Sequence, residues 1–211
     1  MKTQLSFLVL FFFLQNTIIA QQPLVAVSDQ MNVIYMGINN PITVAVENFP
    51  TEHVMVTSDD VKVIPTEKGK YNLQPRFPGK VIIKVQPRGK AIQEIEYRVK
   101  RIPDPIARLG FSSGGNIKAS EFIYYTEINA YLQCFDLGEC EITSQEMTVN
   151  YQDGRTDPVS VVNKSREFSK ETIALMKTVN AGDTVYFDQI GCKCPGDNAS
   201  RKINSMVFQI K

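Results

Sequence analysis

The chain has 211 residues, and 23 lysines and arginines face 22 aspartates and glutamates, for a net charge of +1. So balanced a charge gives no electrostatic reason to expect a nucleic-acid partner. Four cysteines and a single histidine leave few residues for metal binding or nucleophilic catalysis.

The first twenty residues have the layout of a secretory signal peptide. Lys2 precedes an apolar run from Leu5 to Leu14, a polar break follows, and Ala20 stands just before Gln21. A membrane-spanning helix needs about 20 apolar residues, more than this run supplies. We therefore expect residues 1–20 to be removed on export and the mature chain to have no membrane span.

Residues 21–102 are predicted to form a first β-sandwich domain. Apolar and polar residues alternate in PITVAV, KVIIKV and EIEYRVK, as in strands with one buried face. The expected buried set is Val81, Ile83, Val85, Ile95, Tyr97 and Val99, and the expected exposed set is Lys80, Lys84, Glu94, Glu96 and Arg98. Turn signals at INNP, TSDD, EKGK, RFPG and PRGK recur at close spacing. They predict about seven short strands in an immunoglobulin-like fold.

The charges are unevenly distributed between the two halves of the chain. Residues 21–102 hold 11 lysines and arginines against 8 acidic residues, net +3, while residues 103–211 hold 11 against 14, net −3. All 11 basic residues of the first half lie between Lys62 and Arg101. This stretch is either a docking face or the solvated outer faces of the strands.

The segment RIPDPIARLG separates the two halves, with Pro103 and Pro105 on either side of Asp104. Proline fixes its own φ and has no N–H for a sheet, so this segment should end the last strand of the first domain. We interpret it as a stiff joint between two domains with few contacts crossing between them.

Residues 103–211 are predicted to form a second sandwich that contains one short helix. The segments EINAYLQC, EITSQEMTVNY, DTVYFDQI and KINSMVFQI indicate strands. In SKETIALMKTVNAG, Ser169 is a suitable N-cap, apolar residues follow at helical spacing, and Gly182 ends the segment. The fold class is therefore all-β, with two tandem immunoglobulin-like sandwiches joined by a short proline-containing linker. The segment after Gly114 and Gly115 is left undecided.

Cys134, Cys140, Cys192 and Cys194 all lie in the second half. Their C-x5-C and C-x-C spacing fits structural zinc sites poorly, and export favours oxidation. Because Cys134 and Cys140 flank the loop FDLGE, a disulfide across that loop is only a slightly better pairing than any cross-pair. Cross-pairing with Cys192 or Cys194 remains open, as do free thiols and a metal site.

Enzymatic function has little support. His53 is the only histidine, so any Ser-His-Asp or Cys-His mechanism would need it, yet it lies in a loop far from every cysteine in the sequence. Asp59 and Asp60 could in principle act as a glycosidase or calcium-binding pair. They are adjacent in the sequence, however, and adjacent strand residues point to opposite faces. We expect no catalytic residue, no cofactor and no metal.

Several segments together resemble the C-terminal, periplasmic part of the GldM/PorM family of Bacteroidetes gliding motility and type IX secretion. They are MNVIYMGINNPITVAV (31–46), KYNLQPRFPGKV (70–81), VKRIPDPIARLG (99–110), and AGDTVYFDQI (181–190) with the closing RKINSMVFQIK. The resemblance implies a periplasmic location, the last two β-sandwich domains of the family, dimerisation and contacts with outer-membrane-associated ring proteins. No catalytic residue carries over.

The chain also departs from that family. Full-length members begin with a transmembrane helix, which joins them to the inner-membrane motor, and continue with a long helical region, whereas here a signal peptide leads directly to the penultimate domain. The cysteines around FDLGE and in GCKCPGD are additions to the usual pattern. The sequence thus predicts a non-enzymatic module that binds envelope proteins. The alternative is a generic periplasmic or surface adhesion module with the same fold.

Overall fold

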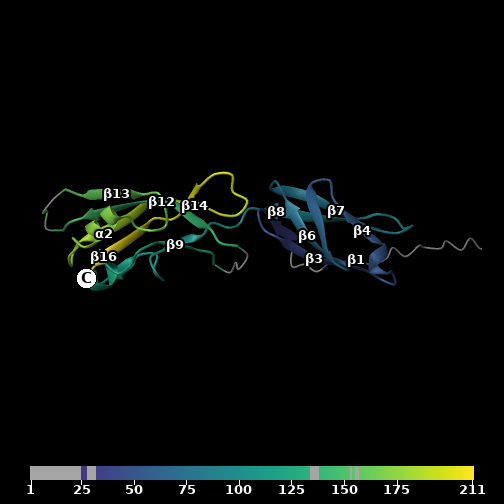
Figure 1. Cartoon of the computed structure of the whole chain (residues 1–211), viewed down its shortest axis with the longest axis horizontal. Coiled ribbons are helices and arrows are strands. Elements are labelled where there is room, and N and C mark those ends of the chain that lie inside the picture. Colours follow the sequence, from purple (N-terminus) through teal and green to yellow (C-terminus); the bar gives the residue numbers. More distant parts are fainter. Residues whose placement is uncertain (1–24, 28–31, 134–137, 153, 155–156) are drawn as a thin grey trace, which may run out of the picture.

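The computed structural model describes residues 25–27, 32–133, 138–152, 154 and 157–211, so the expected signal peptide and Cys134 lie outside the described residues. Two bodies built almost wholly of strands lie end to end along the long axis (Figure 1). The all-β, immunoglobulin-like fold class is confirmed. Within the described ranges, no helix has both the length and the apolar character needed to cross a bilayer.

The first sandwich consists of two four-stranded sheets, in the orders β1-β3-β6-β5 and β2-β8-β7-β4. Its strands are β1 (Val25–Val27), β2 (Val33–Tyr35), β3 (Asn40–Val46), β4 (Val54–Thr57), β5 (Val61–Glu67), β6 (Lys70–Pro75), β7 (Gly79–Pro87) and β8 (Gln93–Lys100). β2 runs parallel to β8, and the other paired strands are antiparallel. Alternate residues of both sheets face inward and form one core.

The predicted register of the β7–β8 hairpin is confirmed. All of the expected buried set is buried except Ile95, which is half-buried against the same core. The expected charged set is exposed except Lys84, which is partly buried and pairs with Asp59 at 2.6 Å. The turn between the strands has Gly89 at φ +74°, as the PRGK signal predicted.

The second sandwich packs a six-stranded sheet against a two-stranded one. The larger sheet has the order β10-β16-β14-β12-β13, with β15 beside β14, and the smaller pairs β11 with β9. The strands are β9 (Ile106–Arg108), β10 (Gly115–Ile117), β11 (Asn129–Tyr131), β12 (Glu141–Asn150), β13 (Val159–Asn163), β14 (Thr184–Lys193), β15 (Arg201–Lys202) and β16 (Met206–Ile210). β10 is parallel to β16.

Aromatic rings fill the centre of the second core. Phe187 of β14 stacks on Phe168 with ring centroids 5.7 Å apart and meets the edge of Phe208 at 6.2 Å. Phe122 closes the cluster at 6.4 Å from Phe187. This core is separate from that of the first sandwich.

The short helix predicted after Ser169 is present as α2 (Lys170–Met176). The Ser169 Oγ accepts a hydrogen bond from the Thr172 N–H at 3.2 Å, as expected of an N-cap. A second helix, α1 (Ala119–Phe122), occupies the segment that the sequence left undecided. At one turn, α1 is too short to show a helical period in the sequence. A 3-10 turn, η1 (Thr51–His53), lies in the first sandwich.

The two sandwiches contact each other more than the sequence predicted. Ile102, placed at the end of the first domain, is 1% exposed and packs in the second core. Tyr35 and Ile38, from the first sandwich, also pack against that core. Among the described residues, no strand of one sandwich pairs with a strand of the other. The contact is therefore made by side-chain packing and not by strand pairing, and it extends well beyond the proline linker.

Candidate functional site: the junction between the two sandwiches

The linker runs between β8, which ends at Lys100, and β9, which begins at Ile106. Pro103 and Asp104 are exposed, whereas Pro105 is buried. The two prolines therefore differ: one restricts the backbone in solvent, and the other also belongs to the packed second sandwich.

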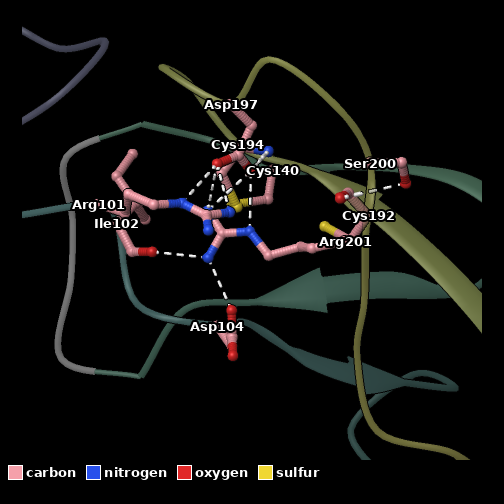
Figure 2. Close-up of a disulfide and its surroundings, with 9 residues drawn as sticks. All are labelled: Arg101, Ile102, Asp104, Cys140, Cys192, Cys194, Asp197, Ser200 and Arg201. Atoms are coloured by element: carbon pink, nitrogen blue, oxygen red, sulfur yellow. Dashed lines mark hydrogen bonds and ion pairs between the residues drawn. A yellow bond between two sulfur atoms is a disulfide. The ribbon is translucent and has the colours of Figure 1, made fainter. Parts of the chain in front are cut away.

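Asp197, in the loop that follows β14, is the electrostatic centre of the junction (Figure 2). Its side chain is 1% exposed. Its Oδ1 accepts hydrogen bonds from Nε and Nη2 of Arg101 at 3.2 and 2.9 Å, and its Oδ2 accepts one from the Cys194 N–H at 2.9 Å. Burial opposes ionisation, but the Cys194 N–H and the guanidinium groups of Arg201 and Arg101 outweigh it and hold the pKa of Asp197 below its usual range.

Arg201 connects the same loop to the linker. Its Nε donates to Asp197 Oδ2 at 2.8 Å, while its Nη1 donates to the Ile102 carbonyl at 2.8 Å and to Asp104 Oδ1 at 2.7 Å. Figure 2 shows the guanidinium between the two carboxylates. The planar fork of arginine suits this arrangement, because it presents several donors in fixed directions. One side chain therefore holds the linker at two points.

Two glycines bring the backbones of the sandwiches together. Gly37, after β2, has φ +75°, and Gly196 has φ +80°. A β-carbon on Gly37 would overlap the backbone nitrogen of Gly196, and one on Gly196 would lie 2.8 Å from the carbonyl carbon of Met36. Both the positive φ and the close approach require glycine at these positions.

A disulfide joins Cys140 to Cys194, so the preferred pairing of Cys140 with Cys134 was wrong and a cross-pair forms. The sheet register explains this pairing. Glu141 of β12 lies opposite Lys193 of β14, so the residues just beyond, Cys140 and Cys194, face each other at the strand ends. The bond anchors the start of the loop that carries Asp197 and Arg201.

Cys192 is buried and free. Burial raises the pKa of its thiol to about 11, so it is neutral at pH 7 and a poor nucleophile. The sulfurs of Cys140, Cys192 and Cys194 lie within 4.8 Å of one another. Because two of them form the disulfide, only one thiol remains to bind a metal in the described cluster.

His53 and Asp59, the residues of the first half that were considered for catalysis, lie outside the charged cluster at the junction. His53 is exposed at the end of η1, with the edge of its ring toward Phe49 and centroids 6.3 Å apart. Asp59 is taken up by its ion pair with Lys84. Neither side chain is part of the charged cluster at the junction.

Sequence reasoning missed Asp197, Arg201 and Arg101. Arg101 was counted only as one of the basic residues, and GCKCPGD, which contains Asp197, was considered only for its cysteines. Arg101 and Asp197 are 96 positions apart, so no local pattern connects them.

This architecture places the chain in the class of tandem immunoglobulin-like sandwich proteins. Residues 24–100 match the family model for the GldM third domain, and residues 103–211 match that for the GldM C-terminal domain. The chain therefore belongs to the GldM family, a family of gliding-motility and type IX secretion components whose C-terminal domains are periplasmic. A search of the curated proteins gave no match.

Alignments to solved structures cover most of the chain but have low scores. Domains 4 and 5 of the S-layer protein SbsC align at 11% identity with a TM-score of 0.34, covering 90% of this chain and 98% of that one. The IG1 and IG2 domains of DIP-gamma align at 9% identity with a TM-score of 0.29, covering 90% and 97%. The Yersinia pseudotuberculosis adhesin InvE aligns at 11% identity with a TM-score of 0.27, covering 88% of this chain and 58% of that one. Scores this low carry no argument about function.

Proposed function

We propose that this chain is an exported, non-enzymatic protein that binds envelope proteins of the gliding-motility and type IX secretion machinery in the periplasm. The observation that carries the proposal is the buried Asp197, which fixes a linker arginine, Arg101, and a loop arginine, Arg201, at the junction of a GldM-family tandem. Such a junction holds two binding surfaces in one arrangement. Pre-organisation of this kind favours binding because less freedom is lost on association.

The chemistry of the described residues supports binding over catalysis. The histidine lies in the first sandwich, whereas the described cysteines lie in the second. Two of those cysteines are bonded to each other, and the third has a protonated, buried thiol at neutral pH. Neither the disulfide nor the protonated Cys192 thiol is an activated nucleophile.

We also propose that residues 1–20 are a signal peptide and that residues 21–102 and 103–211 are the two domains, with Ile102 anchored in the second core. In this proposal Pro103, Asp104 and Pro105 form the joint, and the mature protein dimerises. The rival function is that of a generic adhesion module with the same fold.

Affinity capture tests the proposal. The mature chain, residues 21–102 alone and residues 103–211 alone are immobilised and exposed to envelope extract, and the retained proteins are identified by mass spectrometry. We expect ring components of the secretion machinery to be retained by the mature chain and retained less well by either half. Retention of surface proteins without ring components would support the adhesion module instead. Full retention by one half would show that the joint is only a spacer.

A further inference from the structure

We infer that the groove between the two sandwiches binds an extended acidic peptide segment of the envelope partner, an inference that rests on the proposed function. The groove has a volume of about 400 Å³ and is lined by residues 76–78 of the first sandwich and residues 196–201 of the second, together with Met36 and Arg101. Because both sandwiches form its walls, the groove exists only in the joined arrangement. Clefts between domains are common sites for ligands.

The lining of the groove is positively charged. Arg76, Arg101 and Arg201 contribute three positive charges, and Asp197 contributes the one negative charge. Asp197 is 1% exposed and Arg201 13% exposed, and the two are paired with each other, so the charges presented to a ligand are mainly those of Arg76 and Arg101. Arg101 keeps 52% of its side chain exposed.

Arg76 is the cation with most capacity for a new partner. Its side chain is exposed, and no ion pair joins it to any residue in the described part of the chain. It also lines a neighbouring hollow of about 810 Å³ with Lys62, and none of the described residues of that hollow is acidic. An arginine fork binds a carboxylate through two parallel hydrogen bonds, so Arg76 is suited to an aspartate or glutamate of a partner.

Phe77 supplies an apolar contact beside these charges. It is 74% exposed and lies in the short turn between β6 and β7, next to Arg76. An exposed aromatic ring beside an exposed arginine fits a peptide in which apolar side chains alternate with carboxylates, as in an extended segment. Another hollow that Arg76 and Phe77 also line contains Asp59 and Asp60 together with Lys62 and Lys80, so charges of both signs lie there.

The direct test uses a fluorescein-labelled peptide of alternating aspartate and leucine, twelve residues long, and the purified mature chain. Fluorescence anisotropy is measured with the parent, with Arg76→Glu and with Arg88→Glu as the matched control. Arg88 follows β7, about 26 Å along that strand from the junction end. We expect the parent and Arg88→Glu to bind alike and Arg76→Glu to bind at least about tenfold more weakly, because it loses a charge-assisted hydrogen-bonded pair.

Several outcomes overturn the inference: equal affinity of Arg76→Glu and Arg88→Glu, equal binding of the same peptide with asparagine in place of aspartate, or no binding at all. A photo-crosslinker, p-benzoylphenylalanine, in place of Phe77 should label the bound peptide, and the same group in place of Met55, which is 56% exposed on β4, should not. Labelling at both positions alike would place the peptide outside the groove.

Capture from envelope extract separates this inference from the proposed function. If Arg76→Glu and the parent retain the same envelope proteins, the proposed function stands and the groove is not the binding site. If the parent retains no envelope protein but binds the acidic peptide with the expected loss in Arg76→Glu, the groove stands and the proposed function fails.

Discussion

Gly37 and Gly196 lie in different sandwiches and are in backbone contact, with no room for a β-carbon on either. The turn of one sandwich is thus fitted directly against a loop of the other. This contact and the Asp197 cluster, which Figure 2 shows, both lie where the two bodies meet.

Replacing Gly37 with alanine should separate the sandwiches. The new methyl group would collide with the backbone of Gly196, and opening the junction relieves that collision. Gly89→Ala is the matched control, because Gly89 has φ +74° but no atom lies within 4 Å of the point that its β-carbon would occupy. Both variants bear the left-handed backbone strain, roughly 1–2 kcal/mol. Small-angle scattering should show a longer or broader distance distribution for Gly37→Ala only.

Asp197→Asn should destabilise the second sandwich by about 3–5 kcal/mol, because the largely buried guanidinium of Arg201 would lose the buried carboxylate that compensates its charge. The measurement is the midpoint of urea unfolding. Glu96→Gln is the control, since it removes an exposed ion pair with Lys80 at 2.9 Å and should cost under about 1 kcal/mol. Equal effects of the two variants would mean that the buried cluster contributes no more than a surface pair.

The stability of the second sandwich should fall in acid through Asp197. Its folded pKa lies below the ordinary value of 3.8, so the folded protein binds this proton less readily than the unfolded chain does. The stabilisation is complete above that ordinary value and is lost as the pH falls through the lower, folded pKa. Unfolding midpoints measured from pH 6 to pH 2 should therefore drop less steeply in Asp197→Asn than in the parent. Parallel curves would contradict the assignment.

Loss of the Cys140–Cys194 disulfide should cost about 4 kcal/mol, because the bond closes a segment of 54 residues. The double variant Cys140→Ser/Cys194→Ser is compared with the parent by thermal unfolding. Peptide mapping without reductant should recover this linkage.

In the native parent, Cys192 should resist maleimide at pH 7 until the protein unfolds, because its thiol is buried and protonated. Rapid labelling of Cys192 would contradict its placement.

The linker itself can be loosened without touching a core. Because Pro105 is buried, replacing both prolines by glycine would also remove packing from the second sandwich. Pro103→Gly with Asp104→Asn changes exposed residues only and removes a restricted φ and one partner of Arg201. Envelope capture should weaken by an amount equivalent to about 1–2 kcal/mol per residue freed, while melting changes little. Pro50→Gly, at another exposed proline, should leave capture unchanged.

Local patterns in the sequence determined much of the fold. The alternation in KVIIKV and EIEYRVK predicted the β7–β8 register, because a strand with one buried face must place its apolar residues two apart. Ser169 and the apolar spacing after it predicted α2, because a helix needs both a cap and a buried stripe. The proline-rich segment marked the end of β8, because proline has no N–H to donate to a sheet.

Only the tertiary structure decided what happens at the junction. The partner of Cys140 depends on which residue of β14 lies opposite it, and a sequence spacing carries no information about strand register across 54 residues. The charges of Arg101 and Asp197 likewise acquire a role only when the second sandwich folds and buries that carboxylate beside the linker. Strand alternation and helix caps are local, whereas burial and pairing are set by contacts between distant segments, so the sequence by itself determined the two sandwiches and the structure decided how they are held together.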